Sequence, residues 1–142
     1  MSDAQNQLLP EIGEIVPIWV TPSASLVHVN DTFYCVVTLA PAGATYPTVP
    51  PALPPAGTKV SLVVSAGSAV IVSSAILTVP SNGNTVVFTL LAGALTVGAT
   101  YSRIQLTATV INPDGSTGAS ASNYGPNPAL ALNIYNDLVV IP

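Results

Sequence analysis

The stretch "KVSLVVSAGSAVIVSSAILTV" (residues 59–79) decides the fold class of this chain. After Lys59 the next charged residue is Arg103, so the segment is long and apolar enough to be tested as a membrane span, which needs about 20 mostly apolar residues. Its internal pattern differs from that of a membrane-spanning helix. Val60, Leu62 and Val64 recur at every second position, and small residues interrupt the apolar runs. Short β-branched runs separated by Gly and Ser are typical of strands, so the stretch predicts core strands and no membrane span.

The same texture continues on both sides of this stretch. Further strands are predicted over "IVPIWV" (15–20), "SLVHV" (25–29), "TFYCVVTLA" (32–40), "NTVVFTLLA" (84–92), "TYSRIQLTATVI" (100–111) and "ALALNIYNDLVVI" (129–141). Asn82-Gly83 and "NPDGSTG" (112–118) are turn signals. No segment shows a capped apolar period near 3.6, so no long helix is expected. About seven or eight strands at roughly 8–12-residue spacing predict an all-β, antiparallel β-sandwich.

Two details of that sandwich follow from the strand pattern. Pro17 lies inside the first strand, and because proline lacks an N–H donor that strand is expected at a sheet edge. Alternation along the strands predicts the residues of the core face. These are Phe33, Cys35, Val37, Leu62, Val64, Val86, Phe88, Ile104, Leu106 and Val110.

Length and charge limit the classes of partner. The chain has 142 residues, which fits one domain, and a formal net charge of −4 with only two basic residues. Nucleic-acid binding depends on neutralising phosphates with Lys and Arg, and attraction to anionic lipid head groups depends on the same side chains. We therefore expect neither nucleic acid nor membrane as a partner.

The scarcity of charge also bears on the protein's surroundings. Only 6% of the residues are charged, against about 25% in typical domains. Free monomers usually stay soluble through mixed surface charges, so this composition favours a protein that works within an assembly or outside a crowded cytoplasm. The N-terminus "MSDAQNQLLPEIGEIV" lacks the basic and apolar regions of a signal peptide, which predicts folding in a cytoplasm. The lone Cys35 lies in an apolar run and is expected to be a buried, inert thiol.

Several motifs, in order along the chain, resemble the immunoglobulin-like domains of bacterial surface proteins and phage virion proteins. "VHVNDTFYCVVTL" (27–39) is similar to an early "V-x-G-D-T-F-x-V-x-V-T-L" strand, with Asn30 in place of the usual Gly. "KVSLVVS" (59–65), "LTVPSNGNTVVFTL" (77–90) and "LTATVINPDGSTG" (106–118) follow in the family's order, and "LALNIYNDLVV" (130–140) is similar to its final strand. The resemblance covers about residues 15–141. It implies an immunoglobulin-like sandwich over residues 15–142, preceded by an extended arm over 1–14, and a noncatalytic spacer, adhesion or decoration function.

Two segments are candidates for an interface. "PAGATYPTVPPALPPAG" (41–57) holds six prolines and is expected to form a stiff surface loop. Its PxxP spacings lack a flanking basic residue, so an inter-strand loop is favoured over an SH3-type ligand. The arm is either a flexible terminus or an anchor along a neighbour. The candidate contact residues of the two segments are Leu8, Leu9, Ile12, Tyr46, Val49 and Leu53.

Residues with catalytic or metal-binding chemistry are few and scattered. His28 is the only histidine and Cys35 the only cysteine, whereas a zinc site needs three or four such ligands. Asp114 and the sequon Asn30-Asp31-Thr32 both fit turns better than a calcium loop or a glycosylation site. No nucleophile or phosphate-binding motif is found. We therefore expect no catalytic residues, no metal and no cofactor.

Two functions remain open at this point. The first is a virion structural protein, in the first instance a phage capsid decoration or cement protein that binds the capsid exterior in many copies, or else a tail component. Its partner would be the major capsid protein, and its location the virion. The alternative is a module of a bacterial cell-surface or adhesion protein. In both cases the predicted interface is apolar, because a chain this poor in charge has few salt bridges to offer.

Overall fold

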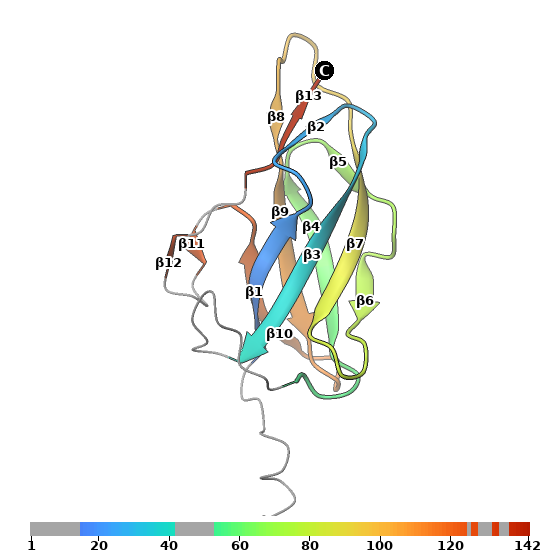
Figure 1. Cartoon of the computed structure of the whole chain (residues 1–142), viewed down its shortest axis with the longest axis vertical. Helices are drawn as coiled ribbons and strands as arrows, with labels where there is room; N and C mark the ends of the chain where they lie inside the picture. Colours follow the sequence, from blue (N-terminus) through green and yellow to red (C-terminus); the bar gives the residue numbers. More distant parts are fainter. Residues whose placement is uncertain (1–14, 42–52, 125, 128–131, 134–136) are drawn as a thin grey trace, which may run out of the picture.

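The computed structural model describes residues 15–41, 53–124, 126–127, 132–133 and 137–142 of the chain (Figure 1). Within these ranges the chain is all-β, with mostly antiparallel sheets and no helix. It follows that none of the described segments is a helix able to cross a membrane. The all-β prediction is confirmed for this part of the chain.

The first of two four-stranded sheets has the order β1-β3-β7-β5. Its strands are β1 (Ile15–Pro22), β3 (Thr32–Pro41), β7 (Thr85–Ala92) and β5 (Ala69–Ile71). β1 pairs with β3 and lies at the sheet edge, and its register shifts between Pro17 and Trp19. This confirms the edge position expected from Pro17, because an edge strand tolerates a missing donor.

The second four-stranded sheet has the order β10-β9-β4-β6. Its strands are β10 (Thr117–Ser122), β9 (Gln105–Ile111), β4 (Lys59–Ala66) and β6 (Ile76–Thr78). β4, the strand that opens the stretch discussed first, pairs on one side with β9 and on the other with β6. The stretch over 59–79 thus forms β4, β5 and β6, as its interrupted pattern predicts.

A smaller three-stranded sheet lies at the end of the molecule that holds the C-terminus (Figure 1). Its strands are β2 (Leu26–His28), β13 (Val139–Ile141) and β8 (Ser102–Arg103), in the order β2-β13-β8. β13 runs parallel to β2 and antiparallel to β8, so one pair departs from the antiparallel expectation. A two-stranded ladder joins β11 (Pro126–Asn127) to β12 (Leu132–Asn133).

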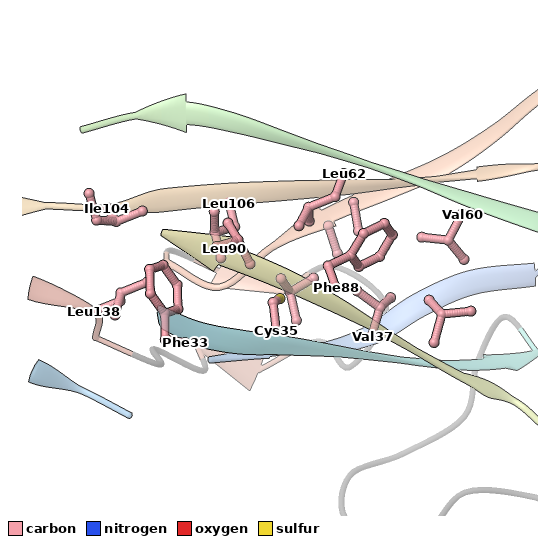
Figure 2. Packing of buried hydrophobic residues seen from close by; sticks show 14 of the residues in the cluster. Phe33, Cys35, Val37, Val60, Leu62, Phe88, Leu90, Ile104, Leu106 and Leu138 are labelled. Carbon is pink, nitrogen blue, oxygen red and sulfur yellow. The ribbon is translucent and has the colours of Figure 1, made fainter. Parts of the chain in front are cut away.

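One buried cluster joins the two larger sheets (Figure 2). Phe33, Cys35 and Val37 from β3 and Phe88 from β7 face Leu62 from β4 and Leu106 from β9 across it. Nine of the ten predicted core residues are buried, and the tenth, Val64, is partly buried against the cluster. The alternation of apolar residues along the strands therefore identified the inner faces correctly.

Three strand predictions need correction. The single strand expected over 100–111 is broken at Ile104, where the chain leaves the three-stranded sheet and enters the second sheet. The segment 117–122 is strand β10, although its first two residues belong to the expected turn over 112–118 and no strand is predicted for the others; its pairing with β9 stabilises it despite its small residues. The described residues of the last predicted strand, over 129–141, form two short strands, β12 and β13.

The backbone explains why Asn30 stands where the resembling domains carry glycine. Asn30 has φ of 71°, in the left-handed region where asparagine is the best-tolerated residue after glycine. The turn is closed by the Asp31 amide, which donates to the His28 carbonyl at 3.0 Å. The turn expected at Asn30-Asp31-Thr32 is confirmed, and the left-handed Asn82 marks the turn expected before β7 in the same way.

Candidate functional site

Only one of the six predicted contact residues lies in the described part of the chain. Leu53 has 43% of its surface exposed, just before a turn that the Thr58 amide closes by donating to the Pro55 carbonyl. Leu8, Leu9, Ile12, Tyr46 and Val49 lie outside the described residues, as does the arm over 1–14. The interface prediction on these six residues stays a prediction.

A more extensive candidate surface lies on the outer side of the sheet β1-β3-β7-β5. We call it the valine face, and it consists of Tyr34, Val36, Val70, Val87, Thr89 and Leu91. Three cross-strand pairs build it, because Tyr34 lies opposite Thr89, Val36 opposite Val87, and Val70 opposite Leu91. Their neighbours along each strand point into the core, so these side chains point outward.

The valine face combines exposure with a lack of charge. Tyr34, Val87 and Val70 each leave about half of their surface exposed, at 49%, 51% and 57%. None of the four strands of this sheet contains Asp, Glu, Lys or Arg. Clustered exposed apolar side chains on one face mark an interaction surface more often than scattered ones do.

The outer face of the second sheet carries several hydroxyl groups that contact one another. Ser65 Oγ lies 2.9 Å from Thr107 Oγ1, and Thr109 Oγ1 lies 2.7 Å from Ser120 Oγ. Lys59 is exposed at one end of this face. The same outer face also carries Val63 and Ile76, which leave 56% and 49% of their surface exposed, so both outer faces present aliphatic side chains and the second is richer in hydroxyl groups.

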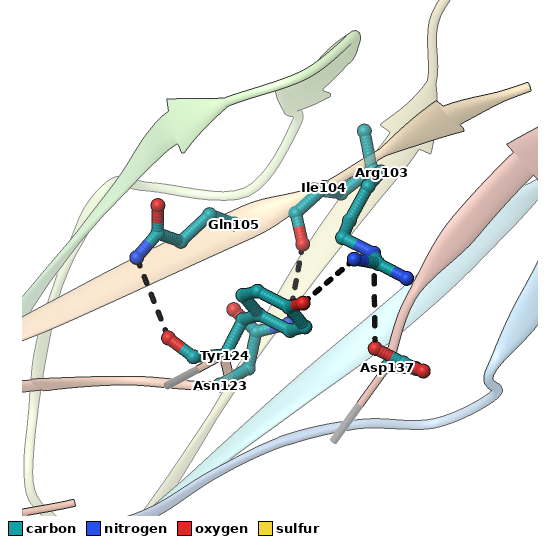
Figure 3. Close-up of polar contacts among 6 residues, drawn as sticks. All are labelled: Arg103, Ile104, Gln105, Asn123, Tyr124 and Asp137. Carbon is teal, nitrogen blue, oxygen red and sulfur yellow. Dashed lines mark hydrogen bonds and ion pairs between the residues drawn. The ribbon is translucent and has the colours of Figure 1, made fainter. Parts of the chain in front are cut away.

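A polar junction secures the bend between β8 and β9 (Figure 3). Asn123, which is 1% exposed, accepts a hydrogen bond from the Leu106 amide at 2.6 Å and donates to the Ile104 carbonyl at 3.3 Å. Beside it, Arg103 Nη1 donates to Tyr124 Oη at 2.6 Å, and Arg103 Nε lies 3.8 Å from Asp137 Oδ1. The arrangement stabilises the junction of two sheets.

The titratable groups of the described residues are dispersed. No group of three or more His, Cys, Asp or Glu side chains with metal-ligand spacing occurs among them. Burial raises the pKa of the Cys35 thiol to about 12, so the thiolate is scarce at neutral pH, and the predicted burial of Cys35 is confirmed. Hydrogen bonds from Ser116 lower the pKa of Asp114, which confirms that Asp114 caps a turn.

Sequence reasoning missed the valine face and the polar junction for different reasons. The outward positions of β3 and β7 were evident from alternation, but their adjacency to β5 depends on the fold. Asn123 lies in "SASNYG", where nothing in the local pattern distinguishes a buried asparagine from one in an exposed turn.

No known family model matches the chain, and no curated protein or solved structure matches it at a significant level.

Proposed function

We propose that this chain is a non-enzymatic structural domain that acts in many copies within a protein assembly. In its most concrete form it is a phage capsid decoration or cement protein of immunoglobulin-like sandwich fold, with the major capsid protein as partner. The support comes from two sources. One is the charge-poor, all-β chain, and the other is the motif order that resembles immunoglobulin-like virion domains.

The observation that carries the proposal is the uncharged sheet β1-β3-β7-β5 with its half-exposed valine face. A protein that works as a free monomer stays soluble because its exposed sheet faces carry charged side chains. A protein held permanently against others gains from apolar outer faces, because each buried square ångström of apolar surface contributes roughly 25 cal/mol. The valine face fits the second case.

Fractionation of the natural source tests the proposal. A culture that produces the protein is separated on a density gradient, and the chain is followed with an antibody. We expect it to sediment with particles that also contain capsid protein. Recovery with the cell envelope would support the alternative, a surface or adhesion module. Recovery at the mass of the free chain, away from any particle or envelope, would contradict both functions.

A further inference from the structure

The turn between β6 and β7 contains Asn82, the only asparagine of the chain that a glycine follows. Asn82 is exposed and has φ of 61°, and none of the described residues forms a hydrogen bond with its side chain. We propose that Asn82 is a modification site at which the side-chain amide is lost spontaneously, by deamidation. This inference is independent of the proposed function.

The reaction requires only Asn82, the next residue and water. The backbone nitrogen of Gly83 attacks Cγ of Asn82, and the new C–N bond closes a succinimide ring. The side-chain nitrogen of Asn82 leaves as ammonia and takes up the proton that the Gly83 nitrogen releases. Water then adds to one of the two ring carbonyl carbons and breaks its bond to the ring nitrogen. Opening at Cγ leaves aspartate, and opening at the main-chain carbonyl leaves isoaspartate, whose backbone is one carbon longer.

The glycine at position 83 removes the main obstacle to this attack. A residue with a Cβ shields its own backbone nitrogen, whereas glycine leaves the approach to that nitrogen open. The Gly83 amide donates to the Pro80 carbonyl at 3.1 Å in a turn at the surface, so this bond must open before the nitrogen reacts. Local opening of a surface turn has a small cost in free energy, so the folded state permits the reaction.

The turn at Asn30 provides a matched comparison within the same chain. Asn30 is also exposed, with φ of 71°, and the amide of the next residue, Asp31, donates to the His28 carbonyl at 3.0 Å. The two turns thus share the left-handed asparagine and the hydrogen bond of the following amide. They differ in the residue after the asparagine, and the Asp31 side chain shields the nitrogen that would attack. We therefore expect Asn30 to react much more slowly than Asn82.

Conversion of Asn82 to isoaspartate should disturb the neighbouring strands. Two residues after Asn82, Asn84 anchors the turn to β3, because its carbonyl accepts from the Leu39 amide at 2.8 Å and its side chain donates to the Leu39 carbonyl at 3.2 Å. An additional backbone carbon at position 82 changes the spacing between β6 and this anchor. The isoaspartate form should therefore unfold at a lower urea concentration than the fresh protein.

Ageing of the purified full chain in warm, mildly alkaline buffer tests the proposal. Trypsin cleaves after Lys59 and Arg103, so Asn82 and Asn84 fall in one peptide, residues 60–103. Mass spectrometry should locate a gain of about 1 Da at Asn82, with Asn84 and Asn30 unchanged when most of Asn82 has reacted. A parallel sample unfolded in guanidinium chloride measures the reaction without the turn, and the rate in the folded chain should lie within about tenfold of it.

Gly83→Ala is the matched variant, because it shields the backbone nitrogen without straining the turn. A Cβ at Gly83 would come no closer than 3.5 Å to any atom beyond the chain neighbours, and φ of Gly83 lies outside the left-handed region. We expect G83A to react at least about tenfold more slowly than the natural sequence. Its urea midpoint should stay constant during ageing, whereas that of the natural sequence falls.

Three results would overturn the inference. They are an Asn82 that reacts in guanidinium chloride but not in the folded chain, equal conversion of Asn82 and Asn30, and equal rates in G83A and the natural sequence. An unchanged urea midpoint after conversion to isoaspartate would contradict the connection between the turn and the Asn84 anchor.

Discussion

Asn123 forms hydrogen bonds with both backbone groups of Leu106, its amide and its carbonyl. Asn123 Oδ1 accepts a hydrogen bond from the Leu106 backbone amide at 2.6 Å, and the backbone amide of Asn123 donates to the Leu106 carbonyl at 3.2 Å. The first of these bonds uses a side chain where a strand partner would normally use its backbone. This side-chain bond lies just after Ile104, where the chain bends from one sheet to another, so the Leu106 amide keeps a hydrogen-bond partner at the bend.

Asn123→Ala should lower the free energy of unfolding by about 2–4 kcal/mol, because the Leu106 amide and the Ile104 carbonyl would lose their buried partner. Urea denaturation measures the loss. Asn112→Ala is the control, since the Asn112 side chain bonds only to Ser116 Oγ, at 3.0 Å in an exposed turn, and should cost less than about 1 kcal/mol. Equal losses in the two variants would show that the buried hydrogen bonds of Asn123 contribute no more to stability than an exposed one.

Arg103→Gln should have a small effect despite the number of contacts that Arg103 makes. Its partner Tyr124 is half-buried, and the Arg103 and Asp137 side chains are about half exposed. Exposed ion pairs and cation–π contacts each contribute up to about 1 kcal/mol. We expect a loss below about 1.5 kcal/mol in the same denaturation assay. A loss as large as that of Asn123→Ala would mean that the ion pair, and not the buried amide, secures the bend.

Gly67 and Gly98 form a matched pair for separating backbone strain from steric overlap. Their φ angles are 89° and 86°, so alanine is strained at both positions. At Gly67 a Cβ would also overlap the Arg103 carbonyl oxygen and approach Ile104 Cδ1 to 2.6 Å, whereas at Gly98 it would meet nothing within 4 Å. We expect Gly98→Ala to cost about 1 kcal/mol and Gly67→Ala at least about 3 kcal/mol, measured by thermal or urea unfolding. Equal costs would show that the bend between β4 and β5 relaxes to make room for a side chain at Gly67.

Cys35 should make the protein lose stability at alkaline pH. Burial raises its pKa from 9.0 to about 12, so the folded state keeps a proton that the unfolded state releases. Stability from this group is therefore full below about pH 9 and falls between pH 9 and 12 by roughly 1.4 kcal/mol per pH unit. Unfolding measured across that range should show a shallower fall in Cys35→Ala. Identical slopes would mean that the thiol ionises without unfolding.

The left-handed turn at Asn30 predicts a substitution that stabilises the protein, unlike the variants above. Asn30→Gly should raise the free energy of unfolding by a few tenths to about 1 kcal/mol, because glycine adopts a φ of 71° without steric cost. Asn30→Val should lower it by about 1–2 kcal/mol, since a β-branched side chain is least tolerated there. Thermal melts of the two variants provide the check, and a destabilised glycine variant would contradict the backbone argument.

The sequence predicted what depends on alternation and turn chemistry. Cys35 and Phe88 were assigned to the core from their own strands alone, and both are fully buried opposite each other in the register of β3 and β7. The strand break at Ile104 left no such trace, because apolar alternation continues through it while the backbone changes sheets. The valine face escaped prediction because Val70 and Val87 are brought to neighbouring strands by non-local pairing, which a local pattern does not contain.

The central position of β13 in its sheet has a consequence for the timing of folding. β2 and β8 lie on either side of residues 139–141 and are joined to each other through them, with Val140 fully buried. During synthesis, β2 is made more than a hundred residues before its parallel partner. β2 therefore cannot find its partner until residues 139–141 have been made and have left the exit tunnel, so Leu26–His28 stays without this pairing while the more than one hundred residues between the two strands are translated.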